Sequence, residues 1–388
     1  MGITGLLPRI SSILERTPLS SYKGKSVAID LSMLTHQGFH GHADKLLNKS
    51  NMTNHGKFLE SSKTDEDREK DEERRENYFI EVVSNQVVNR CLLIVQEGVE
   101  LVAVLDGMTP PLKRGTTGKR RVEAGDAMER VDESASSSSS SWGNEFNTQK
   151  ENYTLIRKAG GSADTKKKIH EVLLKKLRES SIPFIVAPYE ADSQLAFLSN
   201  SWKSVDSGKG DGKFKKSRLA DLIITDDSDA IPYAISSALF KLDSENYGQL
   251  YKRVDLPTLQ PDPALQSNKN PLVFINFSNV MVTVFCIAQG CDYLGNLPQV
   301  GPMRAMEAVR EAFLPYINGE LTLDPENPDK NTPLRRLFDD LRKYMKHLDK
   351  RGRRKYELDF MRAVALFRHP TVYDPMAQGN VIMQVRSS

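Results

Sequence analysis

Four short apolar runs, each followed closely by acidic residues, constrain the fold of this chain more than any other feature of the sequence. The runs are "SVAI" at 26–29, "VELVAVL" at 99–105, "IPFIVA" at 182–187 and "LADLIIT" at 219–225. Their length and their content of Val and Ile are typical of buried strands. Segments with the apolar period of a helix occur at 78–98, 166–180 and 276–290. Strands that alternate with helices predict an α/β fold with a mainly parallel central sheet flanked by helices.

The acidic residues that follow these runs are expected to lie close together. They are Asp30 after the first run, Asp106 after the second, Glu190 and Asp192 after the third, and Asp226, Asp227 and Asp229 after the fourth. The carboxyl ends of parallel strands share one edge of an open sheet, which is where such folds place their sites. An acid at the end of one strand is usually only the N-cap of the next helix. Acids at the ends of four strands indicate a metal site, because bound cations would offset their repulsion.

The kind of acid cluster indicates which metal it would bind and what chemistry it would support. Carboxylate oxygens without His or Cys suit hard cations such as Mg²⁺ or Mn²⁺. Asp292, after the helical segment 276–290, adds one more carboxylate. Because there are more acids than one ion can use, we expect two ions, the arrangement that serves phosphodiester hydrolysis.

A turn after the last apolar helix looks suited to bind a phosphate. The residues "LPQVG" at 297–301 open a new helical segment, so backbone N–H groups near Gly301 would be available to an anion. Gly301 has no side chain to keep a phosphate away. An ordinary connection between two helices is the alternative. Next to a two-metal cluster, the turn is more typical of a hairpin that grips a duplex backbone without reading its sequence.

The composition and net charge do not by themselves identify a binding partner. The net charge of +3 is too small to indicate nucleic acid by itself, and the basic clusters at 112–121, 165–170 and 212–218 could each be a solvated face. The three cysteines have no metal-ligand spacing and suggest a reducing compartment. No signal-peptide pattern and no apolar run as long as a membrane span are found, so we expect no membrane association.

Seven motifs together resemble a known family. They are "MGITGLL", "VAIDLSM", "VLDG", "APYEADSQLA", "ITDDSDAI", "GCDYL" and "LPQVGPMRA", in this order. They are similar to motifs of the structure-specific 5′ nucleases of the flap endonuclease/XPG family. Within that family, "APYEADSQLA" and "VYDPMAQGNVIMQV" most resemble the nuclease core of the exonuclease 1 branch.

The resemblance implies a PIN-like 5′ nuclease fold with a helical arch and a helix-two-turn-helix motif. The expected division is an N-terminal part of the nuclease core at 1–112, an arch region at 113–165, an internal part of the core at 166–275 and a C-terminal helical region at 276–388. Three segments look like insertions: a charged run at 49–76, the Ser-rich part of the arch, which we expect to be partly disordered, and a flexible Gly/Lys/Ser loop at 203–217.

The resemblance also implies an activity. The expected protein is a monomeric nuclear enzyme of DNA repair and replication that uses two Mg²⁺ ions, for which Mn²⁺ can substitute. It would be a 5′–3′ double-strand exonuclease with flap endonuclease activity, acting on DNA with 5′ ends, flaps, nicks or gaps. A K⁺ ion at the helix-two-turn-helix is implied in the same way. We find no sliding-clamp motif in the sequence.

Individual residues take their expected roles from the same resemblance. The metal-binding acids would be Asp30, Asp106, Glu190, Asp192, Asp227, Asp229 and Asp292, with Asp226 outside the metal shell. Lys113 and Arg120 match the catalytic basic pair that contacts the scissile phosphate. The DNA contacts would be Gly2, His36, Arg121, Lys241, Asn296, Val300, Gly301 and Arg304. In the chain's departures from the family, Ser32 replaces an aromatic residue, and the arch after Arg121 aligns with no relative.

Three other functions remain open at this point. The chain could act primarily as a flap endonuclease, or bind junctions without cutting them. It could also be a phosphatase with an Asp-x-Asp pair after a strand, as in "DSD" at 227–229, but this function leaves the other acids and the hairpin unexplained. Cleavage of labelled flap, nicked and blunt duplexes with Mg²⁺ and with EDTA would separate these functions.

Overall fold

The structure is a computed structural model that describes residues 3, 5–47, 65–113, 163–206, 214–259, 272–321 and 332–385. The chain divides into two compact units. The larger unit comprises Met1–Asp30, Glu97–Lys113 and Ile185–Ser388, and the smaller unit comprises Leu31–Gln96 and Arg114–Phe184. Most of the expected arch region, including Arg120 and Arg121, lies outside the described residues, as does Gly2.

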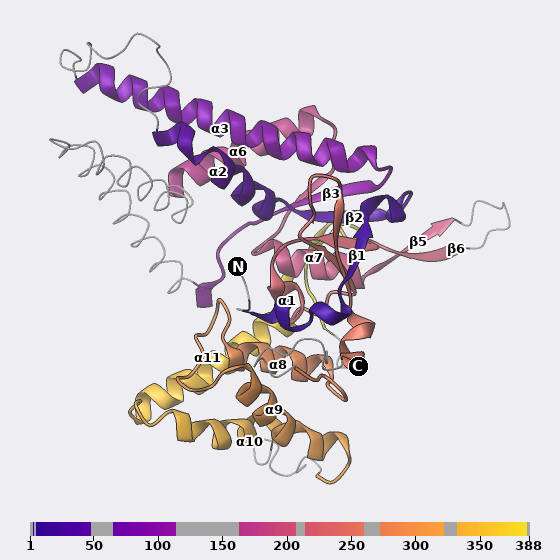
Figure 1. The fold of residues 1–388 in the computed structure, drawn as a ribbon, viewed down its shortest axis with the longest axis vertical. Coiled ribbons are helices and arrows are strands. Elements are labelled where there is room, and N and C mark those ends of the chain that lie inside the picture. Colours follow the sequence, from indigo (N-terminus) through magenta and orange to yellow (C-terminus); the bar gives the residue numbers. More distant parts are fainter. Residues whose placement is uncertain are drawn as a thin grey trace. The chain divides into compact units, whose positions relative to one another are not determined.

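A seven-stranded mixed sheet forms the centre of the larger unit (Figure 1). The strand order is β1-β9-β8-β7-β2-β3-β4. The strands are β1 Glu15–Pro18, β2 Ser26–Asp30, β3 Glu100–Leu105, β4 Phe184–Val186, β7 Leu222–Ile224, β8 Ser237–Phe240 and β9 Tyr247–Lys252. β2 runs parallel to β3 and β7, and β7 runs parallel to β8, whereas β9 is antiparallel to both β8 and β1. The predicted α/β class is confirmed, with an antiparallel edge added to the parallel strands.

The four apolar runs of the sequence coincide with β2, β3, β4 and β7. Every residue of β2 and β7 is buried, as expected for strands covered on both faces. The sequence did not predict β1, β8 or β9. β1 and β9 mix polar and apolar residues, so no unbroken apolar run marks either of them.

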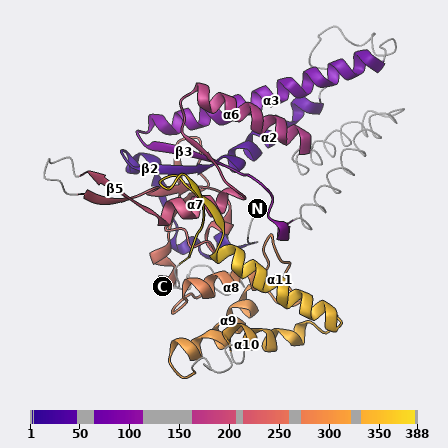
Figure 2. The ribbon, with the colours of Figure 1, turned by 180° about the vertical axis from the view of Figure 1, so that it is seen from behind.

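Helices surround this sheet in the larger unit. They are α1 Leu6–Arg9, α7 Ala191–Asn200, α8 Asn279–Gln289, α9 Pro302–Ile317, α10 Pro333–Leu341 and α11 Lys350–Arg368, with short 3-10 helices η3 Pro111–Lys113, η4 Ser228–Ala230 and η6 Arg342–Tyr344 among them. α7 packs on β2, β3 and β7, and α8 packs on both α9 and α11 (Figures 1 and 2). β10 Thr371–Asp374 and β11 Gly379–Ile382 form a two-stranded sheet after the last helix.

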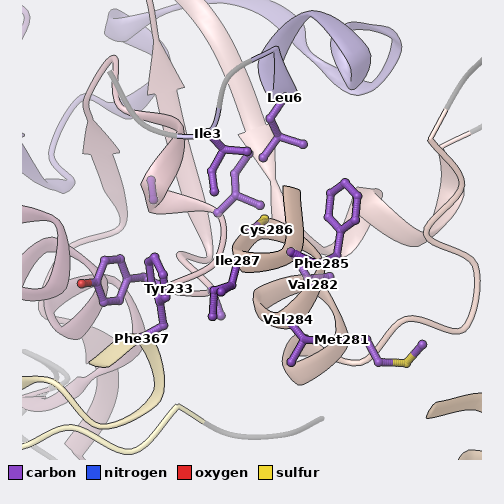
Figure 3. Close-up of a cluster of buried hydrophobic side chains, with 14 of the residues drawn as sticks. Ile3, Leu6, Tyr233, Met281, Val282, Val284, Phe285, Cys286, Ile287 and Phe367 are labelled. Atoms are coloured by element: carbon purple, nitrogen blue, oxygen red, sulfur yellow. The ribbon is translucent and has the colours of Figure 1, made fainter. Parts of the chain in front are cut away.

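The core of the larger unit is built around α8, which is apolar on all sides and buried from Met281 to Gln289. Figure 3 shows side chains of α8 together with Ile3 and Leu6 from the N-terminal segment, and with Tyr233 beside Phe367 of α11. The centroids of these last two rings are 4.7 Å apart. α8 therefore joins the sheet to the C-terminal helices through one continuous apolar cluster.

The segment 203–217 differs from the flexible loop expected from its Gly, Lys and Ser content. Trp202–Asp206 forms β5 and Phe214–Arg218 forms β6, and the two strands pair antiparallel. Only 207–213, which include three glycines, lie outside the described residues. The expectation of a loop over the whole segment was therefore wrong at its two ends. The Gly, Lys and Ser residues of the segment gave no indication of the strands there.

The smaller unit contains the helices α2 Leu31–Leu47, α3 Asp65–Gln96 and α6 Ala163–Glu179. α3 packs against both α2 and α6. Phe39 of α2 meets Phe79 edge-on at 4.8 Å, and Glu76 accepts hydrogen bonds from Thr165 at 2.6 Å and from Lys168 at 2.7 Å. Of the charged insertion 49–76, the residues from Asp65 form the first turns of α3, and the others lie outside the described residues.

One stretch of α3, Glu76–Gln96, is long and apolar enough by composition to span a membrane. No such stretch was expected from the sequence. In the protein its apolar residues Phe79, Val83, Val87 and Cys91 are almost fully buried. They recur at intervals of four, as on the inward face of a packed helix. Packing inside the smaller unit thus accounts for these four residues, whereas Tyr78, Leu93 and Val95 of the same stretch are exposed.

Candidate metal centre

The seven acids predicted as metal ligands all belong to the larger unit. Asp30 is the last residue of β2, and Asp106 directly follows β3. Asp227 and Asp229 lie in the turn after β7, Glu190 and Asp192 lie at the start of α7, and Asp292 follows α8. The parallel strands β2, β3 and β7 thus bring their carboxyl ends, and the acids that follow, to one edge of the sheet.

Asp106 caps a helix that is distant in sequence. Its Oδ1 accepts a hydrogen bond from the backbone N–H of Ala191 at 2.7 Å, where the positive end of the α7 dipole favours a carboxylate. Glu190 occupies the N-cap position of α7, but its side chain makes no capping bond. Because Asp106 takes this role, the carboxylate of Glu190 is available for other partners.

The turn after β7 is tied to the end of β2. The Thr225 hydroxyl donates to Asp30 Oδ2 at 3.3 Å and accepts from the backbone N–H of Asp227 at 3.1 Å. Asp227 Oδ1 then accepts from the N–H of Asp229 at 2.9 Å. This chain of hydrogen bonds fixes three of the acids relative to one another.

Lys113 lies among the acids with its side chain largely buried. Its ammonium group donates to Glu190 Oε1 and pairs with Asp292 Oδ2 at 2.9 Å. Burial alone would lower the pKa of Lys113, but the two carboxylates reverse this effect and raise its pKa above the ordinary value. The site therefore contains one firmly charged cation.

Two tyrosines complete the surroundings of Glu190. The Tyr293 hydroxyl donates to Glu190 Oε2, and the Tyr233 hydroxyl lies 2.9 Å from that of Tyr293. Sequence reasoning missed both tyrosines and Thr225. The position of Tyr293, directly after Asp292 in "CDY", was the only signal, because nothing local shows which acid a tyrosine will reach.

The remaining carboxylates have too few partners. Asp192 Oδ1 and Asp229 Oδ1 are buried without a hydrogen-bond partner in the described part of the protein. The pKa of Asp192 is raised well above its ordinary value, first by burial and then by the charges of Asp227 and Asp30. The pKa of Asp229 is also raised well above its ordinary value, first by burial and then by Asp227 and Asp292. Ionised carboxylates in this setting require additional positive charge.

The acidic side chains are of the kind that binds hard divalent cations. Among the described residues, however, no three Asp, Glu, His or Cys side chains are arranged so that they could hold a metal ion as they stand. Lys113 engages two of the carboxylates, and the orphaned oxygens of Asp192 and Asp229 are the kind of ligand that Mg²⁺ prefers. The residues present therefore fit a metal site that needs some rearrangement of side chains around Lys113.

The backbone at Gly107, next to Asp106, lies so close to the backbone of residues 187–189 that only a glycine fits there. Its N–H donates to Tyr189 O at 2.6 Å, and a Cβ added at Gly107 would lie 1.9 Å from Ala187 O. This contact sets Asp106 beside the start of α7.

We expect Gly107→Ala to destabilise the protein by about 1–3 kcal/mol, as overpacking does, because the backbone around Ala187 must shift. Urea denaturation measures this effect. Gly295→Ala is the matched control, since an added Cβ there meets nothing within 4 Å. Equal midpoints for the two variants would show that the close approach does not constrain the fold.

The predicted DNA contacts are spread over several elements. His36 is exposed on α2 of the smaller unit, where its Nε2 lies 2.9 Å from Nε2 of His40. In the larger unit, Lys241 is exposed, and its backbone N–H donates to Asp226 Oδ1 at 2.7 Å. This bond gives Asp226 a turn-forming role.

Between α8 and α9, the turn contains the other predicted contacts. Asn296 is exposed, whereas the Val300 side chain is buried and its N–H donates to Leu297 O at 3.0 Å. The turn itself therefore uses the N–H of Val300, and the predicted contact of Val300 with DNA stays a prediction. Gly301 is the N-cap of α9. Arg304 Nη2 donates to both carboxylate oxygens of Asp340, at 2.7 and 2.6 Å.

Comparisons with known proteins agree with the motifs. Residues 1–66 match the XPG N-terminal domain. The chain is 26% identical over 381 residues to exonuclease 1 of Oryza sativa subsp. japonica, which covers 97% of this chain and 35% of that protein. It is 27% identical over 378 residues to exonuclease 1 of Arabidopsis thaliana, which covers 97% of this chain and 39% of that protein. Among solved structures, the catalytic core of Rad2 in complex with DNA substrate has a TM-score of 0.49 and 18% identity, with 95% of this chain and 87% of that chain covered.

These sequence matches confirm the resemblance to the flap endonuclease/XPG family. Within it, similarity to exonuclease 1 extends over nearly the whole chain. The chain spans less than half the length of these two relatives.

Proposed function

We propose that this chain is a Mg²⁺-dependent, structure-specific 5′ nuclease that hydrolyses DNA phosphodiester bonds near 5′ ends and single-strand/duplex junctions. The observation that carries the proposal is the set of acids at one sheet edge, in which Asp192 and Asp229 have buried oxygens without partners. Similarity to exonuclease 1 over 97% of the chain supports it. Within this class, we propose a 5′–3′ double-strand exonuclease that also cuts flaps.

The residues that would hold two Mg²⁺ ions are the acids Asp30, Asp106, Glu190, Asp192, Asp227, Asp229 and Asp292. When bound, such ions activate a water molecule and stabilise the leaving oxygen of a phosphodiester, and Mn²⁺ can replace Mg²⁺. The Thr225 hydroxyl links Asp30 to the backbone of Asp227, which holds two strand ends in register. Tyr293 orients the Glu190 carboxylate.

Lys113 is proposed to act on the substrate together with Arg120, which lies outside the described residues. The Lys113 ammonium is charged, buried among the acids and held by Glu190 and Asp292. A cation in this position can stabilise the charge that develops on a scissile phosphate. The ammonium group has three N–H donors, of which Glu190 and Asp292 use two, so one remains for contact with the phosphate.

The turn before α9 is proposed to bind the duplex backbone, with a K⁺ ion at the same place. α9 has no side-chain cap, and its first residue is Pro302, which has no N–H. The N–H groups of Met303 and Arg304 therefore begin the helix without a capping side chain, which favours an anion there. Gly301 leaves room for a phosphate to approach. Asn296 and the exposed His36 and Lys241 are proposed as further contacts with DNA.

Gly301→Ala tests the role of this turn. An added Cβ at Gly301 meets nothing within 4 Å, and the residue has a φ of −85°. We therefore expect a loss of stability of no more than about 1 kcal/mol, because Ala is a poorer N-cap than Gly. Junction binding should be about tenfold weaker, because the methyl group would stand between the helix and a phosphate. Fluorescence anisotropy in EDTA measures the binding. Gly379→Ala, with its nearest atom at 3.9 Å, is the control. Unchanged affinity in Gly301→Ala would exclude a close phosphate at this turn.

The activity itself is tested with 5′-labelled flap, nicked, gapped and blunt duplexes in Mg²⁺ and in EDTA. We expect cleavage in Mg²⁺ only, with mononucleotide products from nicked and blunt ends and short oligonucleotides from flaps. Flap products alone would identify the chain as primarily a flap endonuclease. Tight binding without products would instead identify a junction-binding protein, and release of phosphate from small monoesters would favour a phosphatase.

The cellular setting is part of the same proposal. We propose a monomer that acts in the nucleus on DNA with 5′ ends, flaps, nicks or gaps during repair and replication. Light scattering of the purified chain and imaging of a tagged copy in cells would measure the two properties directly.

A further inference from the structure

The most basic stretch of the larger unit lies far from the acids. Residues 342–355, which run from η6 into the first turns of α11, contain eight Lys or Arg residues and one acid, Asp349. The whole chain has a net charge of only +3. This stretch therefore has an excess of positive charge that the rest of the chain offsets.

Half of these cations take part in local contacts. Arg342 pairs with Asp339 and Glu357, Lys343 with Asp340, and Lys355 with Asp359, and Arg353 Nε donates to Leu348 O. The other four, Lys346, Lys350, Arg351 and Arg354, are exposed, and no ion pair to any of them is found among the residues that the structure describes. We call these four residues the basic patch.

The arrangement of the basic patch is unfavourable for the protein alone. Arg354 follows Lys350 by four residues and Arg351 by three, so on α11 these like charges are neighbours. Lys350 and Arg351 also occupy the first turn of the helix, where the dipole disfavours cations. A bound polyanion would remove both penalties.

We propose that the basic patch is a second contact with the sugar–phosphate backbone of duplex DNA, separate from the turn before α9. This inference rests on the proposed function. Arg and Lys without base-reading partners bind phosphates independently of sequence. α11 packs on α8, so the patch belongs to the same group of helices as the proposed phosphate-binding turn (Figure 1).

The length of α11 gives the distance that a duplex must span. At its far end, Phe367 packs against Tyr293, with ring centroids 5.2 Å apart, and Tyr293 donates to Glu190 of the acid cluster. Lys350 and Phe367 lie on the same helix, about 25 Å apart at the rise of an α-helix. This distance corresponds to about eight base pairs of duplex. A shorter duplex arm could not reach the acids and the basic patch together.

The test compares two triple variants with junctions of two arm lengths. Lys350→Ala/Arg351→Ala/Arg354→Ala removes three charges of the patch and keeps the Asp349 cap, which accepts from the N–H of Gly352. The matched control, Lys23→Ala/Lys25→Ala/Lys252→Ala, removes three exposed cations at the sheet edge opposite the acids. Affinity is measured by anisotropy in EDTA over a range of salt, with duplex arms of about 20 and about 6 base pairs.

With the long arm, we expect the patch variant to bind at least tenfold more weakly, and the slope of log affinity against log salt to fall by about 2–3. With the short arm, the patch variant should bind as the unmodified protein does, and the control should match the unmodified protein with both arms. Circular dichroism checks that α11 remains folded.

Several results would overturn the inference. The first is that the patch variant binds the long-arm junction with unchanged affinity and an unchanged salt slope. The second is that the patch variant loses the same affinity with both arms. The third is that the control variant loses as much affinity as the patch variant. Cleavage of the long-arm junction in Mg²⁺ is measured in parallel. If the unmodified protein fails to cut, the proposed nuclease function is wrong, whereas the binding comparison still decides whether the patch contacts duplex DNA.

Discussion

Asp229→Asn is expected to abolish Mg²⁺-dependent cleavage of a 5′-labelled flap, with a loss of more than about a hundredfold, the loss that even outer-shell metal partners can cause. Asp229 is 4% exposed, and its Oδ1 has no hydrogen-bond partner among the described residues. An amide at this position cannot supply the charge that a divalent cation requires. Junction binding in EDTA should stay within a few fold of the unmodified protein, because phosphate contacts elsewhere persist. Single-turnover cleavage and anisotropy measure the two effects.

Asp226→Asn is the matched control for this variant. It removes one charge from the same acidic run, but Asp226 accepts from the backbone of Lys241 and is not among the proposed ligands. Cleavage by Asp226→Asn should remain near normal. If Asp229→Asn retained near-normal turnover in Mg²⁺, the assignment of this acid to the metal site would be wrong.

Asp229→Asn should lower cleavage but raise the thermal stability of the metal-free protein. Burial and the charges of Asp227 and Asp292 hold the pKa of Asp229 well above its ordinary value, so its ionised form is unfavourable in the folded protein. Without the charge, we expect a higher melting temperature in EDTA and less stabilisation by added Mg²⁺. Thermal unfolding with and without Mg²⁺ measures both changes, and a lower melting temperature in EDTA would contradict the charge argument.

Lys113→Met is expected to have the second largest effect. Cleavage should fall by about a hundredfold or more, as when a group that stabilises developing charge is removed. In EDTA, the free energy of unfolding should also fall by about 3 kcal/mol, because Glu190 and Asp292 lose the cation that pairs with them. Saturating Mg²⁺ should narrow this difference in stability, since a divalent cation can replace the ammonium group. Urea denaturation with and without Mg²⁺, together with Mn²⁺ binding followed by electron paramagnetic resonance, measures these effects.

Lys241→Met provides the comparison for the stability measurements. Lys241 is exposed, and its backbone N–H rather than its side chain bonds to Asp226. Its replacement should leave both the unfolding free energy and the effect of Mg²⁺ unchanged. If Lys113→Met lost the same free energy of unfolding with and without Mg²⁺, the divalent cation would not replace the Lys113 ammonium beside Glu190 and Asp292.

The strands β2, β3, β4 and β7, and the acids that follow them, could be predicted from the residue pattern. Each of these strands is a local run of apolar residues, which is recognisable without knowledge of its neighbours. β2 and β7 are buried throughout, whereas β4 is half-buried to exposed. The grouping of the carboxylates was also predictable, because parallel strands present their carboxyl ends at one edge of the sheet. α8 was predictable because its apolar period is unbroken over its length.

The partners of these residues could not be predicted from the sequence, because they lie far away along the chain. Glu190 reaches Lys113 across 77 positions and Tyr293 across 103, and Asp106 caps α7 across 85. The strands β1, β8 and β9 also depend on their neighbours in the sheet, because the preference of a residue for a strand is set largely by the strands beside it. Local sequence specifies backbone preference and burial. Hydrogen bonds and ion pairs between distant side chains depend on where folding places them, so the surroundings of Lys113 became visible only in the folded chain.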